Sequence, residues 1–376
     1  MFTEFTETDA VPRGRTYGEG RITQPIVMLR AGLPADRLLL FLTADFEGVT
    51  LLHGVLTPGD WGESFIDRRH PHTYLHEGML FAPDVLRDLG GPVRLGVGLG
   101  KGFVPFGTDD PMSRPVERFP VNHHLSQILE RAVSFLALSR GPVRLEGALF
   151  NGDEPIGPSS WPKLSRFGDS WSLRVTVRPA AGLEWQGSRA VVVSPEVRDG
   201  GGLDQSKWST SLRWEGPVRG HAVYAEAEWA RTDLGASAYV LSSVLVEGGI
   251  VLGPHRPYFQ IERSDRPEDE RTLDPYREQR PLIENSILGI TRWTVVTAGY
   301  GVDLPVHRPV VIRPYVEGSL FRIEKVGTGI FDPAQFYGPG HHWSVMTGFK
   351  LFWRMPGHRM GRYEEPPAMA AMRHEP

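Results

Sequence analysis

The stretch Val143–Phe150 reads V-R-L-E-G-A-L-F, and its side chains alternate between apolar and charged or small. Successive side chains of an extended chain point to opposite faces. The valine and leucines therefore share one face, while Arg144 and Glu146 share the other. Alternation with a period of two predicts a β-strand with one apolar and one polar face.

The same alternation recurs along most of the chain, in about fifteen segments of roughly 8–12 residues. Turn formers such as Gly141-Pro142 separate some segments closely, and longer polar stretches such as Gly107–His124 separate others. Short turns at one rim and long loops at the other are typical of outer-membrane barrels. We therefore predict an all-β fold, an antiparallel transmembrane β-barrel of about 14–16 strands. Further alternating segments are Leu40–Glu47, Val93–Gly100, Leu173–Arg178, Val223–Trp229 and Ile312–Leu320.

Two alternatives remain open on these residues alone. The segment Leu125–Leu138 has apolar residues at helical spacing, although a strand over Leu129–Leu138 also fits its neighbours. A soluble all-β protein would alternate as well. Mixed Arg and Glu on the polar faces and tryptophans near the expected strand ends favour the barrel. These tryptophans are Trp171, Trp185, Trp208, Trp214, Trp229, Trp293, Trp343 and Trp353.

Composition excludes several classes of function. The chain of 376 residues has a net charge of −4 and no long basic run, so we expect no nucleic-acid partner. It has no cysteine, which excludes disulfides and thiolate metal sites. No apolar run approaches the ~20 residues of a membrane-spanning helix, so a chain that crosses a membrane must do so as a closed barrel.

The expected organisation has three parts. Residues 1–21 are predicted as an N-terminal extension, with a signal sequence missing upstream, and residues 22–354 as the barrel. Residues 355–376 form a polar C-terminal tail that is either flexible or folded into the lumen.

Several motifs together resemble a known group of proteins. Asp67-Arg68-Arg69-His70-Pro71-His72, followed by His76-Glu77, resembles the D-R-x-H-P-H motif of uncharacterised porin-like bacterial outer-membrane β-barrels. The element from Phe150 through Asn151 and Glu154 to Pro155 resembles their F-N-G-x-E-P element. The passage Gly100–Gly107 is similar to one in phosphate-selective-porin-like barrels. The resemblance implies a barrel in the bacterial outer membrane and implies no particular substrate.

Charged residues on the polar faces are the candidate pore lining. Arginines that face a pore are used for anion selection, and carboxylates for cation selection. Here the two signs are interleaved, which indicates a transverse field, or simply strand-to-strand ion pairing. The candidates are Asp45, Glu47, Arg94, Arg144, Glu146, Arg174, Arg178, Glu226, Glu228, Arg292, Arg313 and Glu317.

The histidines are concentrated near the first motif. His70, His72 and His76 lie within seven residues, beside Asp67, Arg68 and Glu77. Imidazole with carboxylate suits Zn, Cu or Ni, so these histidines are a candidate metal site. The alternative is a structural hydrogen-bond network at the rim.

The sequence therefore predicts a porin-like barrel that passes small polar or charged solutes by passive diffusion, in contact with outer-membrane lipid. It shows no catalytic motif, and we expect neither an enzyme nor a cofactor. Two other hypotheses stay open: a non-conducting barrel with a histidine-rich metal-binding rim, and a soluble all-β binding protein or enzyme.

Overall fold

The computed structural model is an almost entirely β structure. It describes residues 1–10, 16–23, 25–33, 37–50, 72–111, 114–155, 157–269, 287–307, 310–353 and 359–363. The strands are β1 Phe2–Thr8, β2 Tyr17–Thr23, β3 Ile26–Leu33, β4 Leu38–Asp45, β5 Leu75–Ala82, β6 Val93–Gly102, β7 Arg131–Arg140, β8 Val143–Phe150, β9 Ser170–Ala180, β10 Leu183–Val192, β11 Gln205–Val218, β12 His221–Leu234, β13 Tyr239–Ile250, β14 His255–Asp269, β15 Ile287–Val302, β16 Leu304–His307, β17 Val310–Val326 and β18 His341–Trp353. The helical elements are the four-residue α1 Glu47–Thr50 and α2 Pro333–Phe336, with 3₁₀ turns at Arg87–Leu89, His123–Leu125 and Leu164–Arg166.

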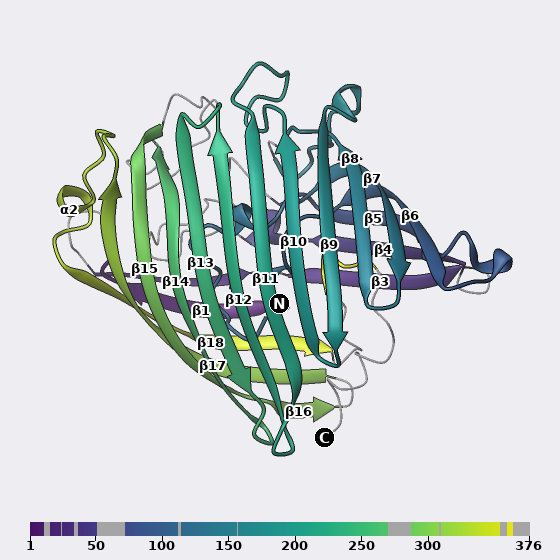
Figure 1. Ribbon diagram of the computed structural model, residues 1–376. Helices are drawn as coiled ribbons and strands as arrows, with labels where there is room; N and C mark the ends of the chain where they lie inside the picture. The colour runs from purple at the N-terminus through teal and green to yellow at the C-terminus, as the bar shows by residue number, and fades with distance from the viewer. Residues whose placement is uncertain are drawn as a thin grey trace.

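The strands form one antiparallel sheet that returns to its own beginning. Each strand from β4 to β14 pairs with the next along the chain. At the far end β18 pairs with both β17 and β1, and β1 pairs with β2. Figure 1 shows the long tilted strands β9 to β15 as the near wall, with β1 and β18 running side by side behind them. The predicted barrel architecture is confirmed.

Two of the wall strands are interrupted. β2 and β3 are two residues apart in sequence and pair with β1 and β4 respectively. β15 and β16 are separated by Asp303 alone, and both pair with β17. If each interrupted pair is counted as one, the eighteen strands of the described residues make sixteen wall positions, within the predicted range.

Connections alternate between the two rims as predicted. Two-residue turns join β7 to β8, β9 to β10, and β11 to β12 at one rim. At the opposite rim the connections between β6 and β7, β8 and β9, and β17 and β18 are long. We call these the short-turn rim and the long-loop rim.

The two faces of the sheet have reversed polarity relative to a soluble protein. On β8, Leu145 and Leu149 are exposed on the outside, while Arg144 and Glu146 are buried on the inside. The same alternation runs through the other walls, for example in β9 and β17. Buried charged groups and exposed leucines at a period of two are what a lipid-facing barrel with a polar interior requires.

The tryptophans divide in a way that the sequence did not predict. Trp171 and Trp208 lie toward the long-loop rim, where the guanidinium of Arg189 lies 5.9 and 5.6 Å from their ring centroids. Trp185 lies toward the short-turn rim and is exposed. Trp293 was expected with them but is fully buried, because it is on the inner face of β15 against Phe321.

Three boundary predictions need correction. The barrel does not begin at residue 22, because β1 and most of β2 belong to the sheet. The helical alternative for Leu125–Leu138 is wrong over β7, where the chain is extended from Arg131. The tail is not wholly flexible, because residues 359–363 are buried. No helix in the described ranges has both the length and the hydropathy to cross a bilayer.

Candidate functional site

The described residues of the connection between β6 and β7, 103–111 and 114–130, lie inside the barrel. All but a few of them are buried. The Gly107 N–H donates to Ser188 Oγ on β10 at 2.9 Å, and the Thr108 hydroxyl donates to Glu228 on β12. Farther along, Asn122 donates to the Asp265 carbonyl on β14 at 3.1 Å. We call residues 103–130 the lumen loop, since it contacts strands on several sides of the interior.

Asp109 anchors the first part of the lumen loop. Its carboxylate accepts hydrogen bonds from Arg213 on β11 and from Arg359 (2.6 Å) and Arg362 (3.2 Å) near the C-terminus. Arg359 also donates to Glu184 on β10 at 3.0 Å. Burial opposes ionisation of Asp109, but the three guanidinium groups hold its pKa well below the usual range. We call these five residues the Asp109 cluster.

Apolar packing adds to the anchoring of the C-terminal segment. The Phe103 N–H donates to the Tyr363 hydroxyl at 3.0 Å. The Tyr363 ring lies 5.5 Å from Phe41 and 5.2 Å from Phe135, measured between centroids. Residues 359–363 of the predicted tail therefore pack against the inner face of the wall and the lumen loop.

The second part of the lumen loop meets a carboxylate-rich wall. Glu317 on β17 accepts the Glu117 N–H at 3.2 Å, and Glu262 on β14 accepts the Val121 N–H at 2.8 Å. Lys350 on β18 donates to Glu117 at 3.1 Å. The loop thus approaches wall carboxylates through its main-chain N–H groups, and its own Glu117 pairs with a lysine of the wall.

Eleven of the twelve candidate pore-lining residues are buried or half-buried, and their role in lining a pore stays a prediction. Arg174 illustrates their environment: it donates to Glu146 at 2.7 Å, inside the barrel. Arg94 is exposed, so it does not share the buried interior. The buried candidates are Asp45, Glu47, Arg144, Glu146, Arg174, Glu226, Glu228 and Glu317, and the half-buried ones are Arg178, Arg292 and Arg313.

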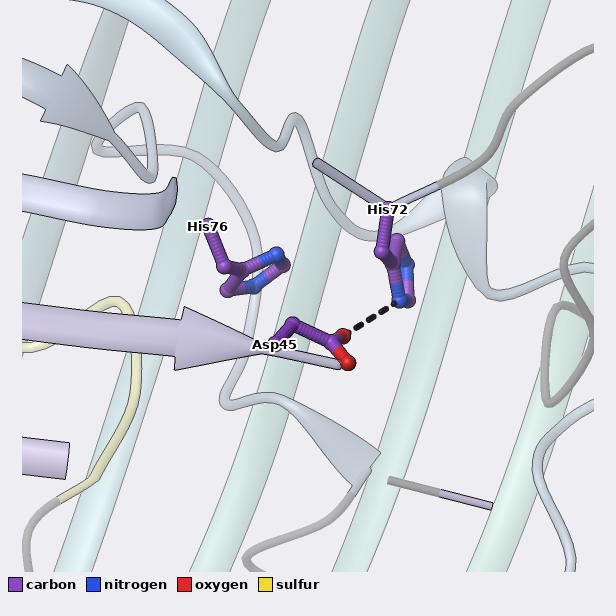
Figure 2. Close-up of side chains that lie close together, drawn as sticks. All are labelled: Asp45, His72 and His76. Carbon is purple, nitrogen blue, oxygen red and sulfur yellow. Dashed lines mark ion pairs between the residues drawn. The ribbon is translucent and has the colours of Figure 1, made fainter. Parts of the chain in front are cut away.

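Two histidines and an aspartate converge at the long-loop rim. Asp45 ends β4, His76 is the second residue of β5, and His72 precedes that strand. One ligand atom from each lies within 4.8 Å of the others. Figure 2 shows the His72 ring directed at the Asp45 carboxylate, with His76 approaching from the side. The closest His72–Asp45 contact, Nδ1 to Oδ2, is 3.3 Å.

Two further carboxylates hold these imidazoles. His72 Nδ1 lies 3.0 Å from Glu47 on α1, and His76 Nδ1 lies 3.1 Å from Glu130 at the end of the lumen loop. Glu130 has a φ of +56°, an uncommon conformation for a residue other than glycine. Burial opposes the charged form of His72, but hydrogen bonds to Asp45 and Glu47 raise its pKa well above the usual value. We call these five residues the histidine cluster.

The two motif regions meet at the end of the lumen loop. The Ala132 N–H donates to Asn151 Oδ1 at 2.6 Å, and Arg131 donates to Glu154 at 2.9 Å. These contacts lie directly after Glu130, which binds His76. Residues of both motifs therefore lie beside the point where the lumen loop ends and β7 begins. Asp67, Arg68, His70 and Pro71 lie outside the described residues, whereas His72, His76, Glu77, Asn151 and Glu154 are within them.

The sequence-based assignment missed the residues that fill the interior. Asp109, Glu117 and Glu130 are not among the predicted site residues, and Arg359 and Arg362 fall within the predicted C-terminal tail. Their partners are up to 253 positions away along the chain. The sequence offers one signal that this connection packs inside the barrel. It lies between two alternating segments and is polar overall, but it also contains apolar residues such as Phe103, Val104 and Phe106.

No protein-family model matches the chain, and no curated protein matches its sequence. Solved structures do match its fold. OprB from Pseudomonas putida has a TM-score of 0.52 at 9% identity, covering 94% of each chain. OmpF from Salmonella typhi, in complex with daunomycin, has a TM-score of 0.50 at 10% identity, covering 93% of this chain and 96% of that one. An anion-selective porin from Comamonas acidovorans has a TM-score of 0.49 at 10% identity, covering 93% and 97%. The fold of this chain is that of porin-like β-barrels.

Proposed function

We propose that this protein is an outer-membrane channel of the porin type, which passes small polar or charged solutes by passive diffusion. The observation that carries the proposal is the reversed polarity of the sheet. Exposed leucines and valines cover the outer face, while charged side chains line the interior. Such an outer face is stable in lipid, and monomeric soluble proteins rarely expose apolar patches of this extent.

The charge distribution inside the barrel favours weak selectivity between anions and cations. Arginines gather around Asp109 and Glu146, whereas carboxylates dominate where the lumen loop meets β14 and β17. Opposed charges across an interior produce a transverse field, which orients dipolar solutes more than it excludes one sign of ion. We therefore expect small polar solutes and ions of both signs to pass.

Reconstitution into planar lipid bilayers tests the proposal. We expect stepwise conductance increments whose reversal potential in a salt gradient lies close to zero. An Asp109→Ala variant should give larger steps, because the lumen loop and residues 359–363 lose their shared anchor. If bilayers that contain wild type or Asp109→Ala at high protein density show no conductance steps, the channel proposal is wrong.

One observation favours a second candidate, a closed barrel. The lumen loop and residues 359–363 occupy the interior with hydrogen bonds on several sides. A closed barrel would give no steps as wild type but would conduct once the anchor is removed. Fractionation separates both candidates from a soluble protein, since a barrel should require detergent and shift its gel mobility on heating.

A further inference from the structure

We propose that Asp45, His72 and His76 bind one divalent transition-metal ion of the zinc type at the long-loop rim. The inference is independent of whether the barrel conducts. It starts from three side chains of ligand chemistry that the fold brings together from β4, β5 and the segment before β5. Their ligand atoms are within 4.8 Å of one another.

One buried atom of this group, His76 Nε2, has no hydrogen-bond partner in the described residues, and its side chain is 2% exposed. Asp45 Oδ2, on a residue that is 1% exposed, meets His72 Nδ1 at 3.3 Å, a contact that a shared metal ion would replace. A buried polar atom without a partner destabilises the folded state, so a native protein normally supplies one. A cation between His76 Nε2 and Asp45 Oδ2 would supply a partner to the imidazole and be bound by the carboxylate.

The surroundings of His76 are those of a metal-binding histidine. Its Nδ1 faces the Glu130 carboxylate at 3.1 Å, which fixes the ring and leaves the free Nε2 available as a ligand. A carboxylate behind the ligating imidazole is the usual second layer of metal sites. Thr73 also donates its N–H to Glu130 at 2.8 Å, which fixes the carboxylate in turn.

His72 completes the set by exchanging a proton for the metal. Its Nδ1 lies between Asp45 (3.3 Å) and Glu47 (3.0 Å). When the ion binds, the Nδ1–H proton goes to solvent and that nitrogen becomes a neutral ligand. Ligand atoms around a tetrahedral zinc ion lie about 3.3 Å apart, so the side chains must close by about 1.5 Å.

The ligand chemistry selects the class of ion. Two imidazoles with one carboxylate suit Zn²⁺, Cu²⁺ or Ni²⁺, while Ca²⁺ and Mg²⁺ require mainly oxygen ligands. Lys101 lies 3.7 Å from Glu130 and offsets its charge, and the Asp45 carboxylate would be the anionic ligand of the dication. The competing explanation is an internal network in which His72 remains a charged imidazolium.

Calorimetry on the full chain in detergent, after treatment with a chelator, decides between them. With ZnCl₂ we expect one site per chain and proton release, seen as a heat that depends on the ionisation enthalpy of the buffer. Co²⁺ should give the visible absorption of a site with nitrogen and oxygen ligands. A wild-type protein that shows neither zinc heat nor a cobalt spectrum would overturn the proposal.

Variants assign the site. His76→Ala should weaken zinc binding at least tenfold, and Glu130→Gln, which keeps all three ligands, should weaken it about 10–100-fold. His221→Ala is the matched control, because it removes an exposed histidine at the short-turn rim. Heat-modifiable gel mobility checks that each variant is folded. Equal zinc affinity in folded His76→Ala and in wild type would also contradict the site.

Discussion

The Asp109 cluster and the histidine cluster are both buried charged groups that hold the lumen loop, one near its start and one at its end. They differ in composition. Around Asp109 three arginines meet two carboxylates, and the Asp109 oxygens are both hydrogen-bonded. In the histidine cluster three carboxylates meet two imidazoles, and His76 Nε2 has no hydrogen-bond partner among the described residues. The Asp109 cluster therefore needs no further ion to hold the lumen loop in place, whereas we propose that the histidine cluster binds a cation.

We expect the largest loss of stability from removing Asp109, the central carboxylate of the Asp109 cluster. Asp109→Ala leaves three buried guanidinium groups without their shared partner, and breaking a buried ion pair in this way costs about 3–5 kcal/mol. We expect a fall of that size in the free energy of unfolding in detergent, together with new protease cleavage at Arg359 and Arg362. Denaturant titration and limited trypsin digestion measure the two.

The control is Asp88→Ala, which removes an exposed partner of Arg37. Exposed pairs contribute about 0–1 kcal/mol. If the free energy of unfolding falls equally in the two variants, the Asp109 cluster does not hold the lumen loop and residues 359–363 in place.

Zinc should stabilise the folded protein only through the histidine cluster. A ligand at one hundred times its Kd stabilises the folded state by about 2.7 kcal/mol. We therefore expect zinc to raise the unfolding midpoint of wild type and of Asp88→Ala, but not of the double variant His72→Ala/His76→Ala. A zinc-dependent rise that persists in the double variant would place any bound ion elsewhere.

A smaller loss should follow from Asn151→Ala, which acts beside the histidine cluster. The substitution leaves the buried Ala132 N–H without its acceptor, a loss of about 1–3 kcal/mol. Because Ala132 follows Glu130 closely, zinc affinity should fall as well, while cleavage at Arg359 should not increase. Hydrogen exchange resolves the two ends of the lumen loop, and increased exchange confined to residues 103–114 would contradict the assignment.

The smallest effect is expected from pH, and it has opposite signs in the two clusters. The pKa of His72 is raised on folding, so its contribution is complete below about 6.5 and is lost as the pH rises through the raised value. The pKa of Asp109 is lowered, so its contribution is complete above about 3.8 and is lost only at more acidic pH.

Hydrogen exchange, corrected for the intrinsic rate, should therefore show residues 128–132 loosening on the alkaline side of neutrality while residues 103–114 stay protected. His123 and His124 serve as internal controls, because burial lowers their pKa values to about 3 and about 4 and keeps both neutral throughout. Loosening of both loop ends together would remove the distinction between the clusters.

The sequence predicted the wall much better than the interior. Alternation is a local property, so the inward direction of Arg144 and Glu146 can be read from eight residues. β1 was missed because its outward positions include Thr3 and Glu7 beside Phe5, which weakens the apolar face. The contacts of Asp109 with Arg359 and Arg362 depend on a loop and a tail that meet only in three dimensions, and no local period encodes them.

In the histidine cluster the sequence predicted part of the set. His72 and His76 were expected as metal ligands from their spacing alone, and this remains a prediction, as does the role of His70. Asp45 was assigned to the pore, because the pairing of β4 with β5 that brings its carboxylate to His72 cannot be read from either segment separately.

The pairing of β1 with β18 also constrains how the protein is made. Phe2 is opposite Lys350, so β1 can pair with β18 only after the residues between them have been synthesised. Until then β1 and the most recent strand each present an unpaired edge, which other chains could join. Contacts of such long sequence separation form slowly. Biogenesis of this barrel therefore requires that the chain be kept from aggregating until β1 and β18 meet.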